Sequence, residues 1–313
     1  MKAARIHRFG PPEVIVIDDL PRPTPVAREV LVRVMAGGVG PWDALIREGK
    51  SKISPPLPLT LGSDLSGVVQ AVGTGVTEFS KGDEVYGVTN PQFCGAHAEC
   101  AVASAEMISR KPKRLSHVEA ASVPVVAITA YQMLFEYAHV VAGQSVLILG
   151  AAGNVGAYAV QFAASTGLHV AAIAKTQDFE FVRGLGAELV VDYQKQQSEE
   201  DTRLVDVVID TVGGKTLERS VRRLKPGGIV VSIVSTQPLP QSSGVRSVFF
   251  YAEVTTARLN TISEWLDRGK LVTNVGTVLS LDNIRTAHEM LAGAPHKRGK
   301  IVLTLASTSG AVT

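Results

Sequence analysis

The segment at residues 147–164, LILGAAGNVGAYAVQFAA, limits what this chain can fold into more than any other. It reads as a buried strand, a glycine-rich turn and a helix, the unit from which doubly wound sheets are built. In this interpretation Gly153 lets the backbone approach a pyrophosphate, and Gly156 lets the helix pack closely on the strand. The N–H groups that begin the helix would bind the anion, so the segment predicts a nucleotide site. The alternative is a purely structural turn, which also needs glycine.

Charge and cysteine content exclude several classes of protein. The 31 basic and 29 acidic residues form no block of like charge, so we expect neither a nucleic-acid partner nor a membrane surface. Cys94 and Cys100 are the only cysteines, which predicts a reducing, cytoplasmic setting. The opening MKAARIHRFG has no apolar leader segment, so we expect no secretory signal. The uncharged stretch at 138–173 is long enough to suggest a membrane span, but its five glycines favour buried parallel strands.

The pattern of apolar residues changes twice along the chain. Short strand-like runs separated by Pro and Gly clusters predict an irregular β-rich domain at the N-terminus. Apolar runs that alternate with helical segments, such as SVLIL, HVAAIA and VDVVID, then predict a doubly wound parallel sheet. The tail returns to strand, short helix and strand, and we expect it to fold back onto the first domain. The predicted α/β organisation is therefore a substrate domain at 1–122 and 264–313, with a nucleotide-binding domain at 123–263.

The end of the second parallel strand distinguishes NAD from NADP. NAD enzymes place an Asp or Glu there to bind the ribose hydroxyls, whereas HVAAIAKTQ places Ala174 and Lys175. An acid would repel a 2′-phosphate and Lys175 would attract it, so the sequence favours NADPH over NADH. The alternative is that Lys175 only points into solvent, and even then the usual NAD contact is missing.

Several long motifs occur in one order along nearly the whole chain. They are MKAARIHRFGPPEVI, GSDLSGVVQAVGTGVTEFSKGDEVYG, AITAYQML, GAAGNVG, LGAELVVDY and HKRGKIVL. In these the chain resembles the zinc-free medium-chain dehydrogenases/reductases of the quinone oxidoreductase (zeta-crystallin-like) branch. The resemblance implies a GroES-like β-barrel closed by the C-terminal segment, an inserted Rossmann domain and a homodimer.

Comparison with zinc-dependent relatives predicts that this chain holds no catalytic zinc. Those relatives carry a Cys where this chain has Gly40, and a His-Glu pair where it has Ser63 and Asp64. Neither Gly40 nor Ser63 supplies a ligand of the expected type. Cys94 and Cys100, with His97 between them, offer another metal site in principle, but a strand pair packing small thiols is the favoured interpretation because a fourth ligand is missing.

The resemblance assigns further residues one by one. The pyrophosphate turn is matched by Gly153, Asn154, Val155 and Gly156, with Asn154 replacing the usual glycine. Tyr193 and Lys175, beside Ala174, would form the 2′-phosphate pocket, although Asp178 stands where a basic residue is usual. The remaining cofactor contacts would be Thr129 near the nicotinamide and phosphates, Thr211 and Val212 near the adenosine ribose, and Val234 and Ser235 around the nicotinamide. Trp42, Leu45 and Phe249 would line the substrate pocket, with plain core packing as the alternative for Trp42, Val234 and Phe249.

The expected reaction is hydride transfer from NADPH to a small electrophile that needs no metal, either a quinone or an activated C=C bond of an enone or enal. Gly40 and Leu45 replace an Asn and a Tyr of many relatives, so we assign no general acid. One alternative is reduction of an enoyl thioester, whose phosphates would approach along Arg47, Lys50 and Lys52. The other is a protein that binds NADPH as a redox sensor or scaffold with little turnover.

Overall fold

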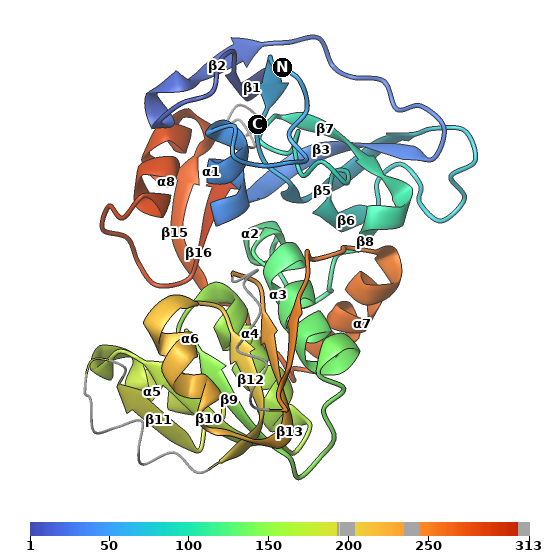
Figure 1. Ribbon diagram of the computed structural model, residues 1–313. Coiled ribbons are helices and arrows are strands. Elements are labelled where there is room, and N and C mark those ends of the chain that lie inside the picture. The colour runs from blue at the N-terminus through green and yellow to red at the C-terminus, as the bar shows by residue number, and fades with distance from the viewer. Residues whose placement is uncertain (193, 195–203, 235–243, 306–313) are drawn as a thin grey trace. The chain divides into compact units, whose positions relative to one another are not determined.

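The computed structural model describes residues 1–192, 194, 204–234 and 244–305. The chain forms two compact units, Met1–Val125 with Val254–Thr313, and Val126–Glu253 (Figure 1). The second unit is therefore inserted into the first. The boundary that we expected at 263 falls inside helix α7 (Thr256–Asp267), whereas the whole helix lies in the first unit. The Tyr86 hydroxyl, which donates a hydrogen bond to the Leu259 carbonyl at 2.8 Å, links the helix to that unit.

The second unit is built on a six-stranded parallel sheet in the order β11-β10-β9-β12-β13-β14. Its strands are β9 (Ser145–Leu149), β10 (His169–Ala174), β11 (Leu189–Asp192), β12 (Val205–Asp210), β13 (Leu224–Ser232) and β14 (Arg246–Phe249). In chain order this arrangement reads 3-2-1-4-5-6, the order of a dinucleotide-binding fold. The central strands are almost entirely buried, as their continuous apolar runs predicted.

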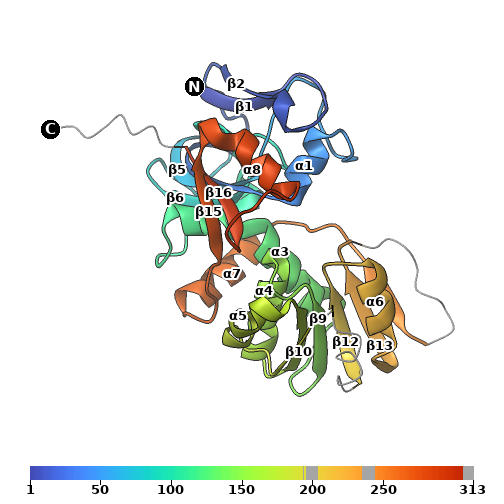
Figure 2. The same ribbon diagram turned by 90° about the vertical axis from the view of Figure 1, so that its left-hand side faces the viewer.

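Helices cover both faces of this sheet. Helices α4 (Asn154–Ser165) and α5 (Phe179–Gly184) lie on one face, and α6 (Gly214–Val221) lies on the other (Figure 2). Helix α3 (Pro124–Tyr131) leads into this unit and continues as a π-helical segment, Gln132–Tyr137. Among the described residues, no helix has the length and apolar character needed to span a bilayer.

The first unit consists of two sheets around one core. A three-stranded sheet has the order β2-β1-β4, from β2 (Ile15–Asp19), β1 (Lys2–Ile6) and β4 (Leu59–Thr60). A larger sheet has the order β15-β16-β3-β5-β6-β8, with β7 also paired to β3. Its strands are β3 (Glu29–Val39), β5 (Asp64–Val72), β6 (Glu84–Val88), β7 (Cys100–Ser104), β8 (Ile108–Arg110), β15 (Val275–Ser280) and β16 (Lys300–Thr304). Ile6 and Ile15 of the small sheet share a buried cluster with Val32 and Leu65 of the large one.

The C-terminal tail completes the larger sheet. Strand β16 pairs antiparallel with β3, with Ile301 opposite Val39, and parallel with β15. The tail therefore folds back onto the first unit, as the sequence predicted. Besides α7, the described part of this unit contains three α-helices, namely α1 (Pro41–Arg47), α2 (His117–Ala121) and α8 (Ile284–Leu291).

Candidate active site

The turn after β9 lies at the point where the strand order of the parallel sheet reverses, between β9 and β12. Helix α4 begins at Asn154, and its N-cap is Gly153, which has no side chain to cover the helix start. A Cβ at position 156 would overlap the carbonyl oxygen of Gly150, so only glycine fits there without a backbone shift. Gly150 itself has a φ of +75°. This backbone geometry fits a bound pyrophosphate at the start of α4.

A second turn, after β12, packs against the first. The Thr211 hydroxyl donates a hydrogen bond to the Leu149 carbonyl at 2.7 Å, and a Cβ at position 150 would lie 2.5 Å from Thr211 Oγ1. Val212, beside it, is exposed. The two turns that the sequence placed around a nucleotide are therefore in direct contact within this unit.

Asp210 organises the second turn, and sequence reasoning missed its role. Its Oδ1 accepts the N–H groups of Val212 at 3.0 Å and Gly213 at 2.7 Å, and its Oδ2 accepts the Ser232 hydroxyl at 2.7 Å. The carboxylate is fully buried. An Asp that ends a buried strand, as in VDVVID, is the signal that would have indicated it.

The end of β10 carries no acid. Ala174 is buried and Lys175 is exposed, at the start of a single 3-10 turn (Thr176–Asp178). Asp178 is buried rather than displayed. The Thr176 hydroxyl hydrogen-bonds to Asp192 at the end of β11, and Tyr193, the other residue assigned to a 2′-phosphate pocket, lies outside the described residues.

The remaining predicted cofactor residues of this unit occupy different environments. Thr129 is buried within α3, whereas Val234, after β13, is half exposed. Phe249 ends β14, and its ring packs edge-on against Tyr251 with centroids 5.1 Å apart. Ser235 lies outside the described residues. The structure thus brings together the two turns after β9 and β12 but leaves the roles of these other positions as predictions.

In the first unit, Trp42 and Leu45 lie on the short helix α1. Leu45 is exposed and Trp42 is partly exposed. The Trp42 indole N–H donates to Ser63 Oγ at 2.8 Å, and the Lys300 ammonium lies 4.1 Å from the centroid of the indole ring. Trp42 is therefore held by specific contacts and is more than core filling.

Lys300 and Asp64 form an ion pair inside the first unit. Lys300 Nζ lies 2.9 Å from Asp64 Oδ2, and the two side chains are 1% and 0% exposed. A Cβ at position 38 would lie 2.9 Å from both Lys300 Cε and Asp64 Cβ, so Gly38 makes room for the pair. Burial raises the pKa of the Asp64 carboxyl, and Lys300 opposes that rise. Sequence reasoning did not single out Lys300, because a lysine in GKIVL gives no sign of burial.

A second buried carboxyl adjoins this pair. Asp43 Oδ2 accepts the N–H of Gly40 at 2.8 Å, which caps the start of α1. Burial raises the pKa of Asp43 to about 7, while the Gly40 hydrogen bond and the charge of Lys300 act in the opposite direction. Trp42, Asp43, Ser63, Asp64 and Lys300 are referred to below as the Lys300 cluster.

The residues of the Lys300 cluster do not fit a catalytic zinc. Gly40 and Ser63 supply no thiolate or imidazole, and the carboxylate of Asp64 is already paired with Lys300. A Cβ at position 40 would also overlap the Trp42 ring, so the indole fills the space that a side chain there would need.

In the cysteine segment, His97 lies between the two cysteines and is packed inside the first unit. His97 is fully buried, its Nε2 lies 3.1 Å from the Gly38 carbonyl, and burial lowers its pKa to about 4. Cys94 and Cys100 are both free thiols, with Cys100 within β7. Over the described ranges, no three His, Cys, Asp or Glu side chains are grouped as metal ligands would be.

Arg47 is not available to a thioester's phosphates. Its side chain is 2% exposed, its Nε donates to the Gly10 carbonyl at 3.0 Å, and its guanidinium lies 3.0 Å from Nδ1 of His288. Lys50 is exposed but lies 2.8 Å from Glu48. Arg47 links α1 to α8. This contradicts the interpretation of Arg47 as a contact for the phosphates of a thioester substrate.

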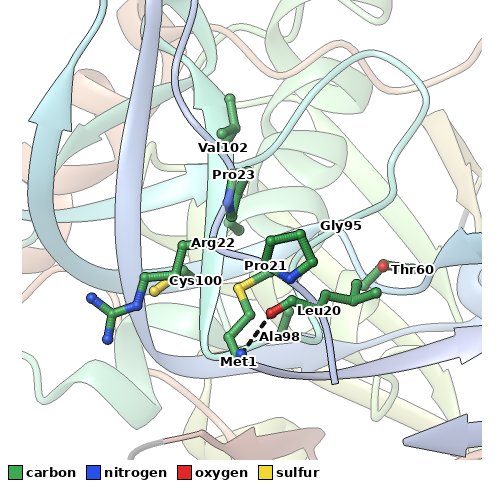
Figure 3. A pocket seen from close by; sticks show the side chains of 11 residues that line it. Met1, Leu20, Pro21, Arg22, Pro23, Thr60, Gly95, Ala98, Cys100 and Val102 are labelled. Carbon is green, nitrogen blue, oxygen red and sulfur yellow. Dashed lines mark hydrogen bonds between the residues drawn. The ribbon is translucent and has the colours of Figure 1, made fainter. Parts of the chain in front are cut away.

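A pocket of about 370 Å³ opens elsewhere in the first unit, around Cys100, Arg22 and the N-terminus (Figure 3). The Met1 amino group there donates to the Leu20 carbonyl at 2.7 Å, as the dashed line marks. None of the predicted site residues lines this pocket.

Comparisons with known proteins agree with this architecture. The family model of the alcohol dehydrogenase GroES-like domain matches residues 26–160, and that of zinc-binding dehydrogenases matches 185–303. The quinone oxidoreductase of Pongo abelii is 31% identical over 97% of this chain and 98% of its own length. The 2-methylene-furan-3-one reductase of Solanum lycopersicum is 34% identical over 87% of this chain and 70% of its own.

The chain belongs to the quinone oxidoreductase family of medium-chain dehydrogenases/reductases. The structure of the Coxiella burnetii quinone oxidoreductase matches it with a TM-score of 0.88 and 31% identity, covering 98% of this chain and 99% of that one. A mycobacterial structure complexed with NADPH matches with a TM-score of 0.85 and 26% identity, covering 97% of this chain and 100% of that one. The predicted family, the GroES-like and Rossmann fold class and the oxidoreductase class are thereby confirmed.

Proposed function

We propose that this family member is an NADPH-dependent oxidoreductase that reduces a quinone or the activated C=C bond of an enone or enal without zinc. The observation that carries the proposal is the pair of glycine-shaped turns at the reversal point of the parallel sheet, where Gly153 and Gly156 leave the start of α4 open. When bound there, NADPH supplies the hydride. Relatives named as quinone oxidoreductases and as a furanone reductase support the two acceptor classes.

This chain's own residues would bind and align the reactants. The turn at 153–156 would hold the pyrophosphate, Thr211 and Val212 would lie at the ribose, and Lys175 with Tyr193 would attract the 2′-phosphate. Absence of an acid at Ala174 and exposure of Lys175 support NADPH over NADH. Trp42, Leu45 and Phe249 would line the acceptor pocket and exclude water from the reacting carbon.

The zinc-free part of the proposal rests on the Lys300 cluster. A Lewis acid needs ligands, and here Asp64 is neutralised by Lys300 while the indole of Trp42 occupies the neighbouring space. A quinone suits such a site because its reduced oxygen takes a proton from water, so no protein acid is required.

A cytoplasmic homodimer completes the proposal. The two free cysteines suit a reducing compartment, and family resemblance supports the dimer. Light scattering on the purified protein tests the dimer, because a measured mass near 33.1 kDa, that of one chain, would contradict it.

The direct test is NADPH consumption by the purified protein, run in parallel with an ortho-quinone and a simple enone, with NADH as the control cofactor. Turnover with NADPH preferred supports the proposal and tells the acceptor classes apart. Tight NADPH binding without turnover of either acceptor would contradict it and would favour the redox-sensor alternative. An enoyl thioester reduced faster than both would favour the thioester alternative.

A further inference from the structure

We propose that Lys300 is a positioning residue for the acceptor pocket, holding the Trp42 indole in one orientation together with Asp64 and Ser63. The inference rests on the proposed function in one respect, namely that Trp42 lines the acceptor pocket. Lys300 lies on β16, Asp64 begins β5 and Trp42 lies on α1, so three distant parts of the sequence meet at one ring.

Burial of the lysine calls for an explanation beyond stability. Its side chain is 1% exposed and faces the fully buried carboxylate of Asp64 at 2.9 Å. Buried ion pairs of this kind are often replaceable by apolar side chains with no loss of stability, because removing both charges from water offsets their attraction. The ion pair contacts a predicted wall of the acceptor pocket, which points to a geometric role.

Two independent contacts fix the indole. Its N–H edge donates to Ser63 Oγ at 2.8 Å, and its face lies 4.1 Å from the Lys300 ammonium. The hydrogen bond restrains rotation within the ring plane, and the cation restrains the tilt of that plane. A tryptophan side chain has only two freely rotating bonds, so two such contacts suffice to select one rotamer.

The surrounding backbone is shaped around this orientation. A Cβ at position 40 would overlap the ring atoms of Trp42, and one at position 38 would press on Lys300 and Asp64. Glycine at both positions thus accommodates the ring and the ion pair. Family resemblance places metal ligands of zinc-dependent relatives at positions 40 and 63, so here a rigid aromatic wall takes the place of a metal centre.

The position of the ring gives it a function. One face of the indole is turned to Lys300, and the side chain as a whole remains partly exposed. A flat conjugated acceptor gains most from a wall held in a fixed plane, because stacking requires parallel rings at van der Waals distance. Loss of the cation should therefore weaken acceptor binding and leave NADPH binding unchanged.

The test uses the full chain and a single fluorescent reporter. Trp42 and Trp265 are the only tryptophans, so Trp265→Phe in α7 leaves Trp42 as the sole emitter. In that background the charge-neutral double variant Asp64→Asn/Lys300→Met removes the cation without leaving a carboxylate unpaired. Lys300→Arg is the conservative control, since a guanidinium keeps both the charge and the stacking on an aromatic face.

In the double variant we expect acrylamide quenching of Trp42 to rise and the KM for the ortho-quinone to rise about tenfold, while the Kd for NADPH stays unchanged. In the Lys300→Arg variant we expect both the quenching and the KM to stay near those of the parent. Unchanged quenching would overturn the proposal, because the ring would keep its orientation without Lys300. Increased quenching with an unchanged KM would also overturn it, because the wall would not touch the acceptor.

Failure of the proposed function gives a different result. If the parent protein reduces neither acceptor, the reductase proposal falls and the acceptor role of Trp42 falls with it. The quenching comparison still decides separately whether Lys300 orients the ring.

Discussion

The predicted site residues of the two units differ in what shapes them, backbone in one unit and buried side chains in the other. In the second unit, the turn after β9 is shaped mainly by backbone, with glycine at positions 150, 153 and 156. In the first unit, the Lys300 cluster consists of buried side chains whose charges must balance. A backbone site tolerates changes of neighbouring side chains, whereas a charged cluster fails when one partner is removed.

The largest expected effect is on the charged side of this comparison. Lys300→Met leaves the Asp64 carboxylate buried without its cation, and we expect the free energy of unfolding to fall by about 3–5 kcal/mol. Urea unfolding measures this as a lower midpoint at similar m. Asp64→Asn/Lys300→Met is the matched control and should recover most of the loss. Equal instability of the single and double variants would mean that shape, and not charge balance, holds the cluster together.

The turn after β9 should lose ligand affinity with a smaller loss of stability. Gly153→Val places a branched side chain at the N-cap of α4, and we expect NADPH affinity to fall about 100-fold, which is about 2.7 kcal/mol. Isothermal titration gives the dissociation constant, and circular dichroism checks the fold. Gly184→Ala in α5, where a Cβ meets no atom within 4 Å, serves as the control. NADPH affinity retained in Gly153→Val would refute the site assignment.

The pH dependence of stability sharpens the contrast further. The folded pKa of Asp43, about 7, lies above its usual value of 3.8, so the folded state holds this proton more tightly. The stability gained from this tighter proton binding is fully present below pH 3.8, the usual pKa, and is lost as the pH rises through the folded pKa of about 7. Asp43→Asn should remove this loss, so its stability relative to the parent should rise by about 2 kcal/mol between pH 5 and pH 7.5. Urea midpoints that run parallel across this range would show that Asp43 titrates normally.

The smallest expected effect concerns the contact between the two turns. Thr211→Val removes the hydroxyl that donates to the Leu149 carbonyl while keeping the shape, and we expect a loss of about 1 kcal/mol. Thermal unfolding measures it. Thr261→Val, whose hydroxyl bonds within α7 on an exposed surface, is the control and should change stability less. A loss at 211 no larger than that at 261 would show that the hydrogen bond between the two turns adds little to stability.

This contrast also explains how much could be predicted from the sequence. Strand, turn and helix around Gly153 follow each other in the chain, so local pattern was enough to predict them, and the alternation of apolar runs predicted a doubly wound parallel sheet. The strand order 3-2-1-4-5-6 came only from the structure. Lys300 and Asp64 are 236 positions apart, and Trp42 belongs to a third segment. Their meeting depends on the pairing of β16 with β3, which in turn pairs with β5, and no local pattern encodes this.

Asp43 and Arg47 show the same limit within one short helix. Both lie in the segment PWDALIR, and both charged side chains are buried. Arg47 is satisfied by Gly10 and His288, which is 241 positions away. From the sequence, the charge of Arg47 suggested an approach for phosphates, but in the folded protein its side chain is buried.

Strand order within the first unit bears on how the protein is made. β16 lies between β15 and β3, so the strand carrying Lys300 belongs to the interior of the larger sheet although it is translated near the end of the described chain. On the ribosome, Asp64 therefore emerges long before Lys300, and residues 36–39 of β3 emerge long before their partner strand β16. The inserted unit at 126–253 has all its strands earlier, so it can fold while the first unit is still being synthesised.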